Sequence, residues 1–185
     1  DITRKIGAMD SLKDLLEEVL DAAILLTGAE RGFLLLKEDA AKTGPLPGFS
    51  VAAARRFHGK AFEGEALQLS LTAVRKALDS GAPLVTDDAQ LDPLFSEKKS
   101  VAAYGLKAIL AVPLDLADRT IGVLYLDNRF QVGLFGEEDV LLTEAFSAQA
   151  ALAIDKARML DELRGSNKRL ETRVKELSEN VKPPV

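Results

Sequence analysis

The chain contains no cysteine, and this absence excludes several kinds of site at once. Without thiols there is no disulfide, no thiolate nucleophile, no cysteine-ligated zinc and no cofactor attached through a thioether bond. The only histidine is His58, which follows a strand-like run. A lone histidine is more typical of a surface or capping position than of a haem ligand, so we assign no metal and leave the cofactor unknown. Three nearby carboxylates, Asp87, Asp88 and Asp92, could hold a hard cation but are more simply solvated loop residues.

Long apolar runs and catalytic motifs are also absent. No run approaches the roughly 20 residues that cross a bilayer, and no secretory leader opens the chain. The motifs G-x-S-x-G, H-E-x-x-H, G-x-x-x-x-G-K-[ST] and G-x-G-x-x-G do not occur. We therefore expect a cytoplasmic protein without catalytic activity or membrane contact. Because the chain begins with Asp1 rather than methionine, we expect it to be a segment of a longer protein.

Neither sign of charge dominates the chain. Its 24 basic and 29 acidic side chains leave a net charge of −5, which implies no general affinity for nucleic acid. The balance is uneven, because residues 156–182 carry eight basic and five acidic side chains and the remainder carries sixteen and twenty-four. Basic residues in that C-terminal segment are interleaved with glutamates, which is typical of a solvated helix face and not of a DNA-binding surface.

Two runs in the middle of the sequence organise the predicted fold. Residues 107–114 are almost continuously apolar, as expected for a strand that is covered on both faces. Residues 120–127 are rich in β-branched and aromatic side chains. The link between the runs is too short for a parallel crossover, so the two predicted strands form an antiparallel hairpin.

Helical and strand patterns flank this hairpin. Ser11 and Asp14 have the spacing of a capping box, and Ser70 and Gly81 have the residue types that begin and end a helix. The predicted elements are helices over 12–27, 70–81 and 137–181 and strands over 32–36, 49–57 and 83–86. Residues 87–105 are less regular, and they are either a binding lid or a connection that contains one short helix near 96–104.

The C-terminal helix carries a seven-residue repeat. Its a and d positions are Leu160, Leu163, Asn167, Leu170, Val174, Leu177 and Val181. This spacing predicts a left-handed coiled coil, and an asparagine at an a position favours a parallel, in-register homodimer. The alternative is a single amphipathic helix that lies on its own domain. A coil of about three heptads is marginal alone, so the globular part should share in dimerisation.

Five segments in family order resemble a GAF domain, of the kind found upstream of bacterial sensor kinases, nucleotide cyclases and sigma-factor activators. They are A-E-R-G-F-L-L-L (29–36), S-L-T-A-V-R-K-A-L-D-S-G-A-P-L-V-T-D-D-A (70–89), A-I-L-A-V-P-L (108–114), I-G-V-L-Y-L-D-N-R (121–129) and F-G-E-E-D-V-L-L-T-E-A-F-S-A-Q-A-A-L-A-I (135–154). The resemblance implies an α+β sandwich, with a central antiparallel sheet of about six strands and helices on both faces. It divides the chain into a linker (1–10), a GAF domain (11–158), a coiled-coil signalling helix (159–182) and a linker to an output domain (183–185).

The resemblance also implies a sensory role in signal transduction, as in two-component systems and transcription regulators. A small-molecule effector would bind between the sheet and the 87–105 lid, and the coil would relay its binding to the output domain. The position of the pocket in the family, transferred to this sequence element by element and not by a motif, gives the expected lining residues. They are Ala54, Arg56, Val74, Asp87, Leu94, Tyr104, Ile109 and Ala111. The alternative from another class is a ligand-free spacer that only pairs two chains.

A second alternative is cyclic-nucleotide binding. GAF domains with that activity carry an Asn-Lys pair, then Phe, then Asp-Glu. Here Asn128, Phe135 and Asp139 match, but Arg129 replaces the lysine and Val140 replaces the glutamate. The match is partial, and the same residues could simply fix the turn and the helix start.

Overall fold

A six-stranded antiparallel sheet forms the centre of the protein, with strand order β3-β2-β1-β6-β5-β4. The structure is a computed structural model that describes residues 2–38, 47–57, 60–61, 68–95 and 99–180. The strands are β1 (Arg31–Lys37), β2 (Phe49–Arg56), β3 (Lys60–Ala61), β4 (Leu84–Thr86), β5 (Ala108–Leu116) and β6 (Arg119–Asn128). Every paired strand is antiparallel, which confirms the predicted fold class.

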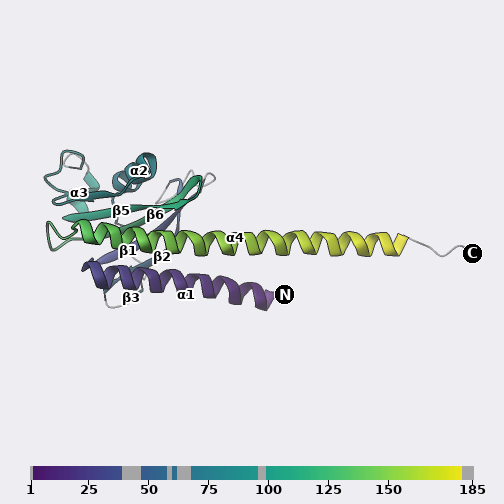
Figure 1. The fold of residues 1–185 in the computed structure, drawn as a ribbon. Coiled ribbons are helices and arrows are strands. Elements are labelled where there is room, and N and C mark those ends of the chain that lie inside the picture. The colour runs from purple at the N-terminus through teal and green to yellow at the C-terminus, as the bar shows by residue number, and fades with distance from the viewer. Residues whose placement is uncertain (1, 39–46, 58–59, 62–67, 96–98, 181–185) are drawn as a thin grey trace, which may run out of the picture.

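Helices cover both faces of this sheet (Figure 1). The long helices α1 (Ile2–Thr27) and α4 (Glu137–Asn180) lie side by side and antiparallel on one face. The short helices α2 (Leu71–Ser80) and α3 (Lys99–Tyr104) lie on the other. The irregular 87–105 segment therefore does contain one short helix, which was one of its two predicted forms. Among the helices of the described part of the chain, none is long and apolar enough to span a membrane.

The central hairpin agrees with its sequence pattern. Strands β5 and β6 pair along their whole length, with Ala111 opposite Tyr125. Pro113 lacks an N–H group, and it lies in β5 beyond the end of β4, where β5 has a neighbour on one side only. A proline is tolerated in a strand where its missing donor faces no partner.

Alternate residues of the central strands enter two separate cores because successive side chains point to opposite faces of a sheet. Leu110 and Leu124 pack beneath α1 and α4. Ile109 and Tyr125 pack beneath α2, in a second cluster that includes Phe95. This double burial explains why β5 and β6 show no polar face in the sequence.

The predicted ends agree with the structure for helix α2, but the predicted start does not agree for helix α1. Helix α2 begins after Ser70, whose hydroxyl accepts a hydrogen bond from Ala73 N, and it ends at Gly81 in the left-handed region, as predicted. Helix α1 begins at Ile2, so the predicted start at residue 12 is wrong. The helix continues through Ser11, and a serine that could cap does not do so where the upstream residues are already helical. Residues 2–10, predicted as a linker, belong to α1.

Helix α4 has 44 residues and is therefore about 65 Å long. Its first half packs on the sheet through Ala150, Ala151 and Ile154, and its second half extends beyond the domain (Figure 1). The predicted single helix from residue 137 to the end of the heptads is confirmed up to Asn180.

Candidate functional site

The predicted lining residues on the sheet lie in two neighbouring rows of one face. Across strands β2, β1, β6 and β5, the first row runs from Arg56 to Ile109 and the second row runs from Ala54 to Ala111, and β3 and β4 continue the sheet on either side. Residues opposite one another in antiparallel strands share a face of the sheet. The structure therefore brings these four residues to the same side of the sheet, the one that α2 and α3 cover.

The middle positions of both rows belong to β1 and β6, and their residues are not among the predicted lining residues. Arg31 and Asp127 stand opposite one another in the first row, and Phe33 and Tyr125 do so in the second. A usable signal existed. Strands β1 and β6 contain four charged residues, of which Lys37 and Arg119 are exposed at strand ends, whereas Arg31 and Asp127 each have the parity of a buried aromatic two positions away.

Arg31 and Asp127 form a buried ion pair. The guanidinium of Arg31 donates from Nε to Asp127 Oδ1 (2.8 Å) and from Nη2 to Asp127 Oδ2 (2.6 Å). Nη2 also donates to the backbone oxygen of Gln68 (2.8 Å), just before α2. The Arg31 side chain is 1% exposed and that of Asp127 is fully buried, so the pair fixes β1, β6 and the start of α2 as one unit.

Tyr125 extends this polar cluster to the helix cap. Its hydroxyl accepts a hydrogen bond from Ser70 N (3.2 Å) and is hydrogen-bonded to Asp127. Burial raises the pKa of the Tyr125 hydroxyl well above its usual value, so the group stays protonated and can donate to the carboxylate. Each charged member of the cluster therefore has a protein partner.

The other predicted lining residues fall into two groups. Val74 is fully buried in the same cluster, and Tyr104 packs against its edge. Asp87 and Leu94 are instead exposed on the segment after β4. Next to them, Asp88 Oδ1 accepts from Gln90 N (3.0 Å) and Asp92 Oδ1 from Leu94 N (2.8 Å), so these two carboxylates shape turns.

Metal ligation finds no cluster to support it in the part of the chain that the structure describes, where no three His, Cys, Asp or Glu side chains gather. His58, the residue considered for haem, lies outside the described residues.

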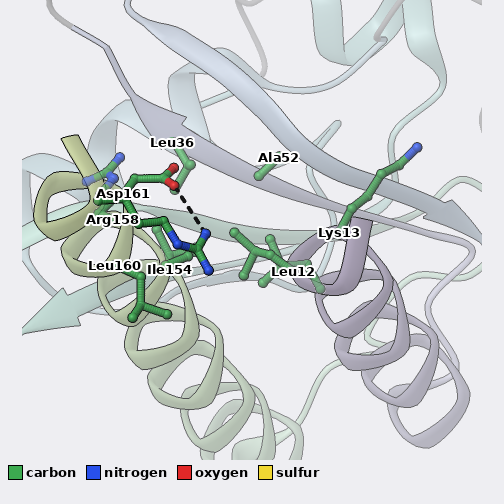
Figure 2. A pocket seen from close by; sticks show the side chains of 11 residues that line it. Leu12, Lys13, Leu36, Ala52, Ile154, Arg158, Leu160 and Asp161 are labelled. Carbon is green, nitrogen blue, oxygen red and sulfur yellow. Dashed lines mark ion pairs between the residues drawn. The ribbon is translucent and has the colours of Figure 1, made fainter. Parts of the chain in front are cut away.

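An apolar cavity of about 420 Å³ lies on the opposite face, where α1, α4 and the sheet meet (Figure 2). Its walls are formed by Leu12 and Leu16 of α1, Leu36 of β1, Ala52 of β2, and Ile154 and Leu160 of α4. In Figure 2, Leu12 reaches from α1 toward α4, with Leu36 and Ala52 behind it on the sheet. Charged side chains of α4 lie at its margin, namely Arg158, Asp161 and Arg164.

A row of exposed apolar side chains runs along the outer side of α4. Its members are Leu141, Leu152, Met159, Leu163, Leu170 and Leu177, which are 56% to 67% exposed. At about 100° per residue, these positions fall within about 40° of one another around the helix axis. We call this row the outer stripe. It lies on the side of α4 away from the buried Ala150 and Ile154.

The profile of the GAF domain family matches residues 11–154 of the sequence. The chain belongs to the GAF domain family. A curated relative, the hybrid signal transduction histidine kinase G of Dictyostelium discoideum, is 32% identical over 77 residues, which are 42% of this chain and 2% of that kinase.

Solved structures share the architecture of this GAF domain. The GAF domain/HD domain protein from Geobacter sulfurreducens is similar with a TM-score of 0.61 and 14% identity, over 84% of this chain and 98% of that one. A methyl-accepting chemotaxis protein is similar with a TM-score of 0.60 and 22% identity, over 85% and 96% of the two chains. At these identities the likeness concerns the fold.

In this GAF domain, the residues of the partial cyclic-nucleotide motif hold turns together. Asn128 Oδ1 accepts from Phe130 N (2.7 Å) and Gln131 N (2.9 Å), and Asp139 Oδ2 accepts from Gly136 N (2.8 Å) at the start of α4. Arg129 forms an ion pair with Glu30. These contacts correspond to the alternative in which the motif fixes the turn and the helix start.

Proposed function

We propose that this GAF domain is a regulatory module of a signal-transduction protein, that it pairs with a second copy of itself in parallel, and that α4 carries its state to an output domain. The observation that supports pairing most strongly is the outer stripe. Surface helices of monomers normally expose charged residues to solvent. A long apolar row on the solvent side therefore indicates a surface that another protein chain covers.

The outer stripe is continuous with the predicted heptad seam. Leu163, Leu170 and Leu177 belong to both, whereas Leu141 and Leu152 lie over the sheet, well before the heptads begin. A partner helix that follows the seam upstream would therefore also cover the domain part of α4. Such an extended contact would stabilise the dimer, because a coil of about three heptads is only marginally stable by itself.

Helix α1 offers apolar side chains to the same kind of contact. Leu25 and Leu26 are 70% and 59% exposed, and α1 lies beside α4 (Figure 1). Two copies that bring α1 and α4 together would bury both sets. We propose that a parallel dimer of this form sends its two α4 helices in the same direction, toward output domains that follow them.

The effector site remains our proposal for the sheet face beneath α2, where Arg56 and Tyr104 are partly exposed polar members of the predicted set. The ligand-free spacer is the rival for this face. The close packing of Val74, Ile109 and Ala111, each fully buried, favours the spacer. Calorimetric titration with cyclic AMP and cyclic GMP tests the cyclic-nucleotide alternative, which requires a saturable heat.

Cysteine cross-linking tests the parallel dimer directly, because the chain has no cysteine of its own. Leu170→Cys places one thiol at a d position of the seam, and Thr172→Cys places one at the outer f position as the matched control. In a parallel, in-register dimer, oxidation converts Leu170→Cys to a disulfide-linked dimer and leaves Thr172→Cys largely monomeric in denaturing gels. Equal cross-linking of both variants, or of neither while sedimentation shows a monomer, would remove the proposal.

A further inference from the structure

The cavity between α1, α4 and the sheet lies on the face opposite the predicted effector site, and its chemistry specifies a ligand class. Its volume of about 420 Å³ falls within the roughly 300–1,000 Å³ of small-molecule sites. Leu16 and Ile154 form its fully buried floor, and Leu12 and Leu36 are half-buried at its sides. Such walls offer no polar group deep in the cavity, so they fit an alkyl chain.

The margin of the cavity supplies positive charge. Arg158 and Arg164 lie there together with one acid, Asp161. Arg164 and Asp161 approach only to 3.8 Å and both are about half exposed, so their attraction is weak. Arg158 has no hydrogen bond or ion pair within the described ranges. A guanidinium recognises a carboxylate through two parallel hydrogen bonds, and Arg158 is available to do so.

We propose that this cavity binds a single-chain fatty acid, with the alkyl chain against Leu12, Leu36 and Ile154 and the carboxylate at Arg158 and Arg164. The setting makes the positive margin distinctive, because the chain outside residues 156–182 carries sixteen basic and twenty-four acidic side chains. An anion therefore meets a local basic site on an otherwise acidic domain.

The position of the cavity connects such a ligand to α4. Leu160 lines the cavity and is also the first residue of the predicted heptad seam. An alkyl chain in the cavity would touch α4 at the point where the helix leaves the sheet. This binding site does not require the parallel dimer, so it can be tested apart from it.

The probe is dodecanoate, titrated below its micelle concentration into the full chain by isothermal calorimetry, with dodecanol as the uncharged analogue. We expect saturable binding of one dodecanoate per chain. In Arg158→Gln/Arg164→Gln, dodecanoate should bind about tenfold more weakly and dodecanol unchanged, because only the charge-assisted bonds are lost. Arg169→Gln, farther along α4, is the matched control and should bind both as the original chain does.

A second variant tests the cavity itself. Ala157 lines the cavity, and Ala148 lies exposed on the same helix outside it, so Ala157→Phe and Ala148→Phe add equal bulk. Ala157→Phe should abolish binding of both probes while circular dichroism shows an intact fold, and Ala148→Phe should not. No saturable dodecanoate binding, or undiminished binding in Ala157→Phe, would overturn the proposal. A third outcome would also overturn it. If the original chain does not bind dodecanoate and Ala157→Phe no longer forms a dimer, then the cavity is a contact site for a second copy of the chain.

Discussion

Arg31 places a positive charge in the interior of the sheet face beneath α2, where it is compensated by Asp127. Removing one member of a buried ion pair leaves the other charged and desolvated, which typically costs about 3–5 kcal/mol. We therefore expect Arg31→Met to lower the free energy of unfolding by about that amount, measured by urea denaturation at neutral pH.

The matched comparison replaces both charges. In Arg31→Met/Asp127→Leu no uncompensated charge remains, and buried ion pairs exchanged for apolar residues of similar size are often neutral. The double variant should be clearly more stable than Arg31→Met alone. A double variant that is less stable than the single one would mean that Asp127 is held chiefly by Tyr125 and the backbone, and not by Arg31.

Glu30 gives a pH-dependent contribution at the start of β1. Burial raises the pKa of Glu30, but hydrogen bonds from the Arg129 side chain and backbone and the charges of Arg129 and Arg31 outweigh burial, so the pKa lies below its ordinary value of 4.5. A carboxylate with a lowered folded-state pKa stabilises the fold above pH 4.5, and this stabilisation is lost as pH falls through the folded-state pKa.

Glu30→Gln should therefore reduce stability by about 1 kcal/mol at pH 7, and the difference should disappear in strong acid. Denaturant melts of both proteins at several pH values measure it. The variant Arg129→Gln serves as the control, because it removes the partner and should remove most of the same pH dependence. A pH-independent difference would contradict the ion pair as its source.

At the scale of the elements, the sheet depends on a close backbone approach at Gly122 of β6. A Cβ atom at this position would lie 2.1 Å from the carbonyl oxygen of Leu35 in β1, so an alanine there must displace a strand. We expect Gly122→Ala to cost at least about 2 kcal/mol. In Gly165→Ala the new Cβ would have its nearest neighbour at 3.8 Å within α4, so helix propensity should raise stability by about 0.5–1 kcal/mol.

Thermal melts followed by circular dichroism compare the two glycine variants in the same protein. Opposite signs are the expected result, since one glycine is required by a close contact and the other lies in a helix with room for a methyl group. A mild effect of Gly122→Ala would show that β1 and β6 can separate locally without loss of the sheet.

The elements that the sequence predicts well are those with local causes. The β5–β6 hairpin follows from two apolar runs and a short link, and α2 follows from Ser70 and Gly81. The predicted start of α1 at residue 12 was wrong, because a capping residue shows where a helix can begin and not where it does begin. Local patterns cannot tell whether upstream residues will be helical.

The candidate site shows the same division. Arg56, Val74 and Ile109 were predicted from the elements in which they lie. The structure places Arg56 and Ile109 on one face of the sheet and Val74 in α2, which covers that face. Arg31 and Asp127 are separated by 96 positions in sequence, and only strand register brings them together. The part of the outer stripe that precedes the heptads, Leu141, Leu152 and Met159, was also missed, because an apolar residue in a helix does not reveal whether it faces the sheet or solvent.

At the scale of the whole molecule, Asn167 is the residue that should specify how two copies meet. It lies at an a position of the predicted seam, between Leu163 and Leu170, and it is exposed on α4. A buried asparagine pair reduces the stability of a coiled coil but selects two strands in register. If the proposed dimer forms, Asn167→Val should therefore raise its melting temperature and at the same time broaden its oligomer distribution in sedimentation velocity.

The control for this prediction is Thr172→Val, which makes a similar polar-to-apolar change at the outer f position of the same helix. It should leave both the melting temperature and the oligomer distribution nearly unchanged, because an f position stays in solvent in either assembly. If Asn167→Val behaves like Thr172→Val, then Asn167 faces solvent in both chains, and the two α4 helices diverge before residue 167. The proposed relay would then have to pass through the domain part of α4, where Leu141 and Leu152 belong to the outer stripe.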